Sequence, residues 1–240
     1  MNAIKNLLML ALFMVPAVAL ANEGVALDKA HYDIHDQASL QRGAKYFVNY
    51  CLNCHSASYM RYNRLHDIGL TDDQIKANLL FTGEKVGETM DTALNKKEAK
   101  SFFGATPPDL TVIARSRGAD WLYTYLRGFY KDETRPTGWN NVAFDKVGMP
   151  HVLWQLQGVQ ELEVEKHGEH ETHKLVLVKP GTMKPAEYDA MVGDLVNYLV
   201  WMGEPVQTKR VTIGIFVLVF LGLFFVVAYY LKKEFWKDVH

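Results

Sequence analysis

Residues 51–55 read Cys51-Leu52-Asn53-Cys54-His55, and these two cysteines are the only ones in the 240-residue chain. The C-x-x-C-H pattern is typical of covalent c-type haem attachment. Two thiols at this spacing can each form a thioether to one vinyl group of the porphyrin, while the next residue presents its imidazole to the iron from the same side. We therefore expect Cys51 and Cys54 to carry one haem c and His55 to be an iron ligand.

A redox-active dithiol and half of a zinc site are the alternatives for this cysteine pair. A zinc site needs further cysteine or well-placed histidine ligands, and the sequence has no second cysteine pair. A thioredoxin-like dithiol lies in a strand–helix–strand unit. Here the pair ends a predicted helix over residues 36–50, in which Leu40, Ala44 and Phe47 recur at helical spacing. The haem is the favoured interpretation.

The N-terminus has the parts of a secretory signal peptide. A single positive charge precedes an apolar run over residues 7–20, and Ala19-Leu20-Ala21 forms an A-x-A cleavage site. A first transmembrane helix is the alternative, but the run is short for a span and Pro16 interrupts it. We expect residues 1–21 to be removed, which leaves residues 22–207 as the exported haem domain.

A second long apolar segment lies near the C-terminus. Residues 211–231 contain no charged side chain, and at about 1.5 Å per residue they reach roughly 31 Å, the thickness of a bilayer core. A buried helix of a soluble domain is the alternative, but a helix that is apolar on all faces needs protein all around it. We expect residues 208–240 to form a single-pass membrane anchor. Because the signal peptide exports the preceding domain, the haem is expected on the exported side of the membrane and the C-terminus in the cytoplasm.

The remaining pattern predicts a mainly α-helical fold. We expect helices over residues 36–50, 71–80, 110–116, 120–129 and 185–203. Apolar residues recur at helical spacing in the first and the last two, with Trp121 and Tyr125 in the buried stripe of 120–129. Asp36 is a candidate cap for the first helix, a Thr-Asp-Asp cap signal opens 71–80, and Pro107-Pro108-Asp109 opens 110–116. Residues 92–106 are polar and end in a loop, and residues 134–150 are too rich in Gly, Pro, Asn and Asp to be regular. Alternation over residues 158–178 predicts a β-hairpin. We expect a cytochrome c-like haem domain with loop insertions and a β-hairpin, followed by one transmembrane helix.

The sixth iron ligand decides whether such a haem transfers electrons or reacts with a substrate. A methionine closes the site and raises the potential, whereas an open position binds small ligands. Met149 lies in the irregular segment Val147-Gly148-Met149-Pro150, where glycine permits close backbone approach and proline stiffens the loop. Met183 and Met191 are the alternatives, although Met191 lies on a helical apolar stripe that is typical of core packing.

The chain resembles the cytochrome c1 family, the haem subunits of the cytochrome bc1 complex, in its bacterial form. The resemblance covers most of the chain after the signal peptide and is carried by the following segments: Gln41-Arg42-Gly43 through Tyr46 into residues 51–55, Pro107-Pro108-Asp109-Leu110, Ile113-Ala114-Arg115-Ser116-Arg117-Gly118, Gly148-Met149-Pro150, and Trp201-Met202-Gly203-Glu204-Pro205 before the anchor. The combination is far more specific than the C-x-x-C-H pattern alone.

The resemblance implies roles for further residues. It makes Met149 the axial ligand, and it places Arg117, with Arg115 close by, at the haem propionates, where a bidentate guanidinium suits a carboxylate. It also places Pro107 and Pro108 in a loop against the haem. A solvated helix end is the alternative for the two arginines.

The resemblance also implies a function. The chain would accept an electron from the Rieske iron–sulfur protein and pass it to cytochrome c, within a dimeric, membrane-bound complex that includes cytochrome b, and it would not be an enzyme on its own. A membrane-anchored cytochrome of a terminal oxidase or of a periplasmic dehydrogenase is one alternative. A haem enzyme with an open iron, such as a peroxidase, is another. The net charge of −1, from 26 basic and 27 acidic side chains, gives no sign of nucleic-acid binding.

Residues 155–184 depart from the family pattern. They carry five glutamates and three histidines: Glu161, Glu163, Glu165, Glu169, Glu171, His167, His170 and His173. The acidic side chains would attract a basic cytochrome c by steering that weakens with salt. The histidines suit a metal less well than they suit a solvated hairpin tip.

Overall fold

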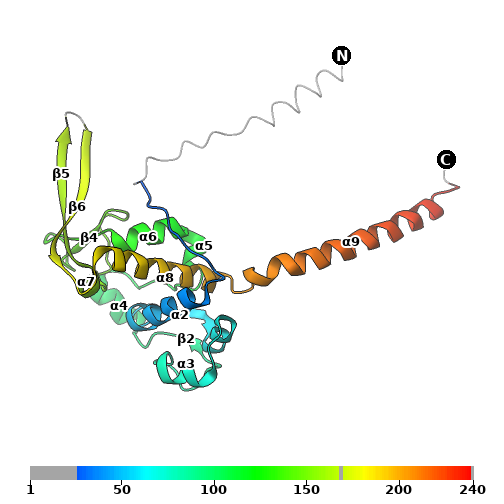
Figure 1. The fold of residues 1–240 in the computed structure, drawn as a ribbon, viewed down its shortest axis with the longest axis horizontal. Coiled ribbons are helices and arrows are strands. Elements are labelled where there is room, and N and C mark those ends of the chain that lie inside the picture. Colours follow the sequence, from blue (N-terminus) through cyan, green and yellow to red (C-terminus); the bar gives the residue numbers. More distant parts are fainter. Residues whose placement is uncertain (1–25, 168–169, 239–240) are drawn as a thin grey trace, which may run out of the picture.

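The computed structural model describes residues 26–167 and 170–238, so the expected signal peptide lies outside the described part. The elements, in chain order, are α2 (Gln37–Tyr46), a π-helical turn η1 (Phe47–Cys51), β1 (Ala57–Arg61), the 3-10 helix η2 (Tyr62–Ile68), α3 (Asp72–Asn78), β2 (Thr89–Met90), α4 (Lys96–Phe103), α5 (Ile113–Arg117), α6 (Ala119–Arg127), β3 (Phe129–Lys131), β4 (Trp139–Asn141), α7 (Trp154–Gln157), β5 (Gly158–His167), β6 (His170–Pro180), α8 (Pro185–Gly203) and α9 (Gln207–Phe235). The mainly helical class is confirmed (Figure 1).

The centre of the domain is α8, with α2 packed along it on one side and α6 on another (Figure 1). The approach of α2 is close because Gly43 has no side chain: a Cβ there would lie 2.2 Å from the carbonyl oxygen of Asp194. Arg42 reinforces the same contact with two hydrogen bonds to the Asp194 carboxylate, at 2.6 and 2.8 Å. The fixed contact between α2 and α8 therefore positions the residues that follow α2.

Arg127, at the end of α6, ties that helix to α8. Its guanidinium donates to Asp189 at 2.6 and 3.2 Å and to Asp28 at 2.7 Å. The hydroxyl of Tyr188, buried on α8, donates to the carbonyl oxygen of Leu126 at 2.9 Å. Charged and buried hydrogen bonds of this kind fix the relative position of two helices better than apolar contacts alone.

Two predicted helix ends are confirmed in detail. Asp36 caps α2 by accepting from the backbone N–H of Ser39 at 3.0 Å, and Thr71 and Gln74 form a capping box at the start of α3. After Tyr46 the helix widens into the π-turn η1, which carries the chain to Cys51. The predicted helix over residues 36–50 is therefore a helix whose last turn has a different hydrogen-bond pattern.

The structure shows elements in two segments for which neither a helix nor a strand was predicted. Residues 92–106 contain α4, which Asn95 caps by accepting from the N–H groups of Lys97 and Glu98 at 2.9 and 3.4 Å. Residues 134–150 contain the short strand β4, which pairs antiparallel with β3. Only Ala99 of α4 is buried, so that segment has too little apolar periodicity to indicate a helix. The two buried residues of β4, Asn140 and Asn141, are polar, so no apolar alternation indicates that strand.

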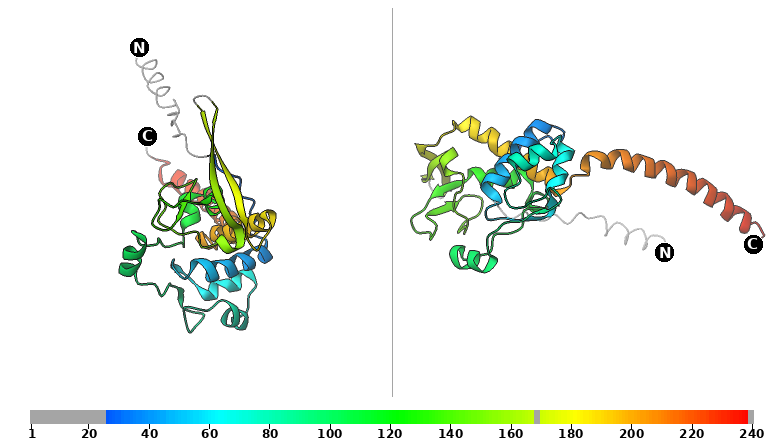
Figure 2. Two further views of the ribbon diagram at one scale, coloured as in Figure 1. Left: turned by 90° about the vertical axis from the view of Figure 1, so that its left-hand side faces the viewer. Right: turned by 90° about the horizontal axis from the view of Figure 1, so that it is seen from below.

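The hairpin of β5 and β6 is confirmed, and it projects from the domain beyond the N-terminal end of α8 (Figures 1 and 2). The two strands pair from Gly158 opposite Pro180 to His167 opposite His170. Gln160 joins the base to the domain by donating to the carbonyl oxygens of Arg127 and Phe129 at 3.0 and 2.9 Å. The side chains of residues 165–173, and with them the three histidines, lie outside the described part.

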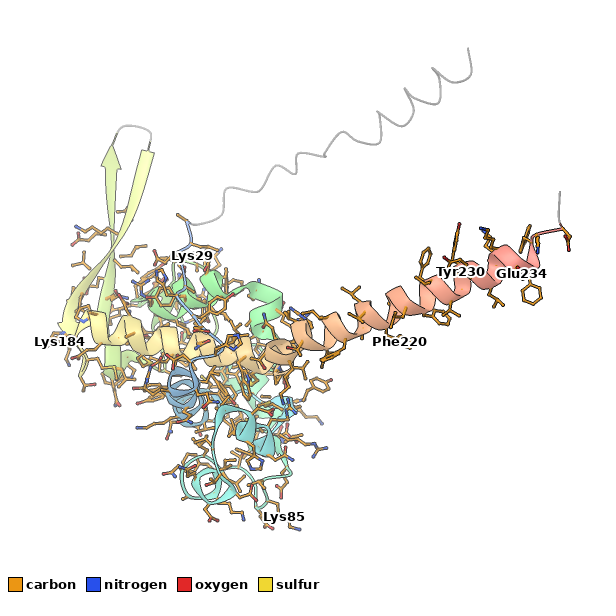
Figure 3. The ribbon with its side chains drawn as sticks, turned by 45° about the vertical axis from the view of Figure 1, so that its right-hand side comes forward. Lys29, Lys85, Lys184, Phe220, Tyr230 and Glu234 are labelled. Carbon is orange, nitrogen blue, oxygen red and sulfur yellow. The ribbon has the colours of Figure 1, made fainter. Side chains whose placement is uncertain are left out.

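From the other end of α8, α9 leaves the domain as a separate helix (Figures 1 and 2). Its apolar side chains are largely exposed, and Phe220 and Tyr230 are each 64% exposed (Figure 3). The helix is long and apolar enough to cross a membrane, with a mean hydropathy of 2.9 in its most apolar stretch. A soluble domain would bury such a surface, so the exposure of α9 fits the predicted anchor.

Candidate haem-binding site

An apolar cavity of about 350 Å³ lies between the C-x-x-C-H segment, the loop before α5, α6, the Met149 loop and α8. Six of the seven predicted site residues line it: Cys51, Cys54, His55, Pro108, Arg117 and Met149. The other walls are mostly apolar or aromatic and include Phe103, Leu110, Ile113, Trp121, Leu122, Tyr125, Leu126, Phe144, Val152, Leu195 and Leu199. Segments that extend from Tyr50 to Leu199 in the sequence therefore line one cavity.

The imidazole of His55 is oriented by the loop that Pro108 belongs to. Its Nδ1 lies 2.7 Å from the carbonyl oxygen of Pro108, and since a carbonyl oxygen can only accept, Nδ1 carries the proton. Burial lowers the pKa of His55 and outweighs the opposite effect of this hydrogen bond. A neutral ring with its proton on Nδ1 leaves the Nε2 lone pair available, which is the form that binds a metal.

Asp109 holds this loop in place beside His55. Its carboxylate accepts from the backbone N–H of Ser58 at 2.8 Å and from the N–H and hydroxyl of Thr111 at 2.9 and 2.6 Å. Burial alone would raise the pKa of Asp109, but these hydrogen bonds outweigh it and hold the pKa below its ordinary value. The Pro108 carbonyl is thereby fixed at the position that His55 requires.

The cysteines stand on the same wall as His55. The backbone N–H of Cys54 and that of His55 both donate to the carbonyl oxygen of Cys51, at 3.1 and 2.9 Å, so the motif is a tight turn. Burial raises the pKa of Cys51 to about 12, whereas a redox-active dithiol needs a lowered thiol pKa. Within the described residues no group of three or more His, Cys, Asp or Glu side chains is placed to hold a metal ion. The geometry fits neither alternative for the cysteine pair.

Met149 reaches the cavity from the loop before α7. The loop lies close to the end of α4, because a Cβ on Gly148 would come within 2.9 Å of the Phe103 carbonyl oxygen. The Met149 sulfur accepts a hydrogen bond from the Tyr125 hydroxyl, with an O–S distance of 3.4 Å. By contrast, Met191 is buried in the core and Met183 packs against it. Of these three candidate ligands, Met149 has the position that a haem ligand needs.

The structure places Arg117 and Arg115, the two predicted propionate partners, at different sites. The Arg117 side chain lines the cavity, with its guanidinium carbon 5.1 Å from the centre of the Trp121 ring and 6.0 Å from that of Phe144. The Arg115 side chain does not line the cavity and donates to the Glu204 carboxylate at 2.9 Å. The same carboxylate also pairs with Arg210 at the start of α9. Arg115 therefore joins the domain to the anchor and is not brought to the cavity.

Sequence reasoning missed several cavity residues. Trp121 and Tyr125 were expected only as the buried stripe of a helix, yet both line the cavity and stack on each other, with ring centres 4.8 Å apart. Their spacing of four residues put them on one helical face, which was the available signal. Phe103 lies in the polar segment of residues 92–106 and Phe144 in the irregular segment of residues 134–150, and neither segment has a periodicity that indicates an inward side chain.

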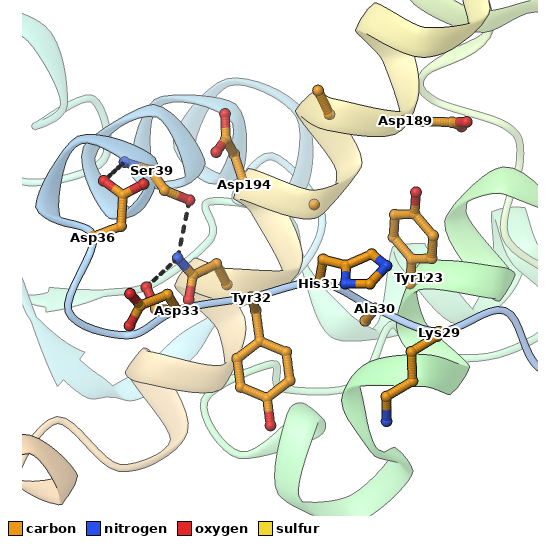
Figure 4. A pocket seen from close by; sticks show the side chains of 13 residues that line it. Lys29, Ala30, His31, Tyr32, Asp33, Asp36, Ser39, Tyr123, Asp189 and Asp194 are labelled. Carbon is orange, nitrogen blue, oxygen red and sulfur yellow. Dashed lines mark hydrogen bonds between the residues drawn. The ribbon is translucent and has the colours of Figure 1, made fainter.

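A second, more polar hollow of about 750 Å³ lies on the α8 face away from the motif, between the segment of residues 29–39 and α8 (Figure 4). Its carboxylates are largely occupied: Asp36 caps α2, while Asp189 and Asp194 pair with arginines. None of the predicted site residues lies there. Its polar lining does not suit a large apolar ring, so the chemistry of the chain belongs to the first cavity.

The first cavity fits a haem c by the chemistry of its donors. The two thiols and the free Nε2 of His55 lie on one wall, and a thioether sulfur enters from another segment. The walls are mostly apolar or aromatic and include one guanidinium, that of Arg117. Apolar walls match the macrocycle, and a guanidinium matches a propionate.

Comparison with known proteins agrees with this arrangement. Residues 28–239 match the model of the Cytochrome C1 family. The chain is 50% identical over 242 residues to cytochrome c1 of Allochromatium vinosum, which covers 98% of this chain and 99% of that one. It is 28% identical over 285 residues to cytochrome c1 of Rhodospirillum rubrum, covering 100% and 99%. It is also 55% identical over 241 residues, 100% of both chains, to a Nitrosomonas europaea protein named ammonia monooxygenase gamma subunit. The chain therefore belongs to the cytochrome c1 family, and it is the membrane-anchored, electron-carrying subunit with one covalent haem c that works beside cytochrome b and the Rieske protein in the cytochrome bc1 complex.

Proposed function

We propose that this chain passes electrons from the Rieske protein to a cytochrome c through a haem bound by Cys51 and Cys54, with His55 and Met149 as axial ligands. The observation that carries this assignment is that the free Nε2 side of a neutral His55 and the sulfur of Met149 belong to one apolar cavity. A histidine–methionine pair closes the iron to small ligands and favours electron transfer over substrate chemistry.

The haem supplies one-electron oxidation and reduction, and the residues of the chain set the conditions for it. The apolar walls exclude water, which disfavours the more highly charged oxidised form and raises the potential. The Pro108 carbonyl holds the proton of His55 on Nδ1 and fixes the ring orientation. No bond to a substrate is made or broken, so the chain needs no general acid or base.

The ligand assignment is tested by the absorption spectrum of the oxidised protein. We expect Met149→Leu to abolish the methionine-to-iron band and to let carbon monoxide bind the reduced haem. Met183→Leu is the matched control, because it removes a methionine that packs against the core, and it should leave the band intact. A band that persists in Met149→Leu would disprove the assignment, and carbon monoxide binding to the native protein would favour an open-site haem enzyme.

The same proposal makes Arg117 the partner of a haem propionate and leaves Arg115 out. A guanidinium beside aromatic rings stabilises a carboxylate by charge and by hydrogen bonds. Arg117→Gln should lower the midpoint potential, since the lost positive charge had favoured the reduced form, which carries one positive charge less. Arg115→Gln is the matched control, and its potential should stay within about 10 mV of the native value because the side chain pairs with Glu204. Equal shifts in both variants would contradict the assignment.

The name of the Nitrosomonas relative raises a second candidate, a subunit that serves an ammonia monooxygenase. The family match over residues 28–239 favours the bc1 complex. The two candidates differ in the partners that leave the membrane with this chain. We expect cytochrome b and the Rieske protein to copurify in mild detergent. An oxygenase core, or the core of a terminal oxidase or a periplasmic dehydrogenase, would overturn the assignment.

We further propose that residues 1–21 are cleaved, that residues 22–207 face the periplasm, and that residues 208–240 anchor the chain with its C-terminus in the cytoplasm of a bacterium. The exposed apolar surface of α9 supports the anchor. N-terminal sequencing of the mature protein should begin at Asn22. Alkaline phosphatase fused after residue 240 should be inactive, whereas a fusion before α9 should be active. A dimeric complex is expected, and the mass of the purified complex tests it.

A further inference from the structure

We propose that Tyr125 is a positioning residue for Met149, and that its hydroxyl tunes the methionine sulfur as an iron ligand. The inference rests on the proposed ligation of iron by Met149. The hydroxyl oxygen and the sulfur are 3.4 Å apart, and the hydroxyl is the donor because a thioether can only accept. Among the described residues, the sulfur is the one hydrogen-bond partner of that hydroxyl.

The phenol ring of Tyr125 is held from several sides. It stacks on Trp121, with ring centres 4.8 Å apart and an angle of 12° between the planes. It meets Phe129 edge to face at 5.1 Å. The main-chain carbonyl of Tyr125 accepts from the side-chain amide of Asn141, at 2.8 Å, and Asn141 is itself 1% exposed. A ring fixed in this way presents its hydroxyl at one place in the cavity.

The Met149 loop is held against the same row of rings. His151, two residues after Met149, is buried and stacks face to face on Phe129, with ring centres 4.8 Å apart. Phe129 therefore contacts both Tyr125 and His151, and the hydroxyl and the sulfur are joined through packing as well as through their hydrogen bond. Because packing holds both the phenol ring and the methionine loop, the contact between hydroxyl and sulfur is a fixed feature of the fold and not a chance approach of two flexible side chains.

A thioether sulfur has two lone pairs, so it can bind iron with one and accept a hydrogen bond with the other. The hydrogen bond withdraws electron density from the sulfur and weakens it as a donor. Ferric iron depends on that donation more than ferrous iron does, so the bond favours the reduced form and raises the potential. Removal of the hydroxyl should shift the equilibrium toward the oxidised form by about fivefold, or ~40 mV at 59 mV per tenfold for one electron.

The experiment is a redox titration of the intact complex with Tyr125→Phe, which removes the hydroxyl and keeps the ring. Tyr123→Phe is the matched control, because Tyr123 lies on the same helix and its ring faces the Arg127 guanidinium at 4.5 Å. We expect a fivefold change for Tyr125→Phe and less than 1.5-fold for Tyr123→Phe. An unchanged or raised potential in Tyr125→Phe would overturn the proposal.

A second comparison separates this inference from the ligand assignment. In a Met149→His background the hydroxyl no longer has a sulfur to bind, so Tyr125→Phe should cause no further shift; a shift of the same size there would overturn the tuning role. If Met149→His keeps the methionine-to-iron band, the ligation itself is wrong. If the Tyr125→Phe complex assembles poorly, labelling the native protein with fluorotyrosine makes the hydroxyl a stronger hydrogen-bond donor. The midpoint potential of the haem should then rise, and no rise would overturn the proposal.

Discussion

The close contact between α2 and α8 predicts opposite effects for the same substitution at two glycines. A Cβ added at Gly43 would lie 2.2 Å from the Asp194 carbonyl oxygen and 2.6 Å from the Tyr198 Cβ. Ordinary carbon contacts begin near 3.5 Å, so the helices would have to separate by roughly 1 Å. At Gly193, also in a helix, the nearest atom outside it is the His31 carbonyl oxygen at 3.8 Å, which is ordinary contact.

The magnitudes follow from two opposing effects. Overpacking costs about 3 kcal/mol when neither neighbour can move away, and here both neighbours are part of the α8 backbone or its first side-chain atom. Replacing a helical glycine by alanine returns about 1 kcal/mol. We therefore expect Gly43→Ala to lower the free energy of unfolding by about 2 kcal/mol and Gly193→Ala to raise it by up to ~1 kcal/mol.

Thermal unfolding of the purified protein, followed by circular dichroism and by haem absorbance, measures both changes. For a domain of this size the expected shifts in midpoint are about −4 to −8 °C for Gly43→Ala and about +1 to +4 °C for Gly193→Ala. Because α2 leads through η1 to Cys51, Gly43→Ala should also reduce haem incorporation. The reasoning fails if Gly43→Ala raises the midpoint as Gly193→Ala does.

Three further predictions concern stability. Arg127→Ala should lower the free energy of unfolding by about 2 kcal/mol in urea titrations, because it removes charged hydrogen bonds around a side chain that is only 26% exposed. Arg42→Ala, at a side chain that is 55% exposed, should lower it by less than ~1 kcal/mol. A larger loss for Arg42→Ala than for Arg127→Ala would refute this prediction. The lowered pKa of Asp109 gives stability that is complete above its unfolded value of about 3.9 and is lost as the pH falls through its folded value. Asp109→Asn should therefore be destabilising at pH 7 and show a smaller loss below pH 4, whereas parallel pH curves for the two proteins would contradict the role. Tyr188→Phe should cost about 1 kcal/mol without changing the haem spectrum, and a changed spectrum would show that α8 moves.

Local sequence signals determined the elements that depend on neighbouring residues. The helix over residues 185–203 was predicted with the bounds that the structure shows, because its apolar stripe is long and regular. The C-x-x-C-H turn and the exposed apolar α9 are likewise encoded within a few residues or by composition alone. Residues 96–103 escaped prediction because only Ala99 of that helix is buried, which leaves too little periodicity to read.

Tertiary structure decided which side chains meet. The proton position on His55 depends on a carbonyl 53 residues away, and the contact between Tyr125 and Met149 joins residues 24 apart. Arg115 and Arg117 look equivalent in the sequence, but they point to different partners because residues two apart on a helix lie on different faces. The sequence by itself thus predicted Cys51 and Cys54 as the attachment points of a haem. Which groups surround it follows only from the packing of α2, α6 and the Met149 loop around α8, since hydrogen bonds and packing act over a few ångströms in space regardless of separation along the chain.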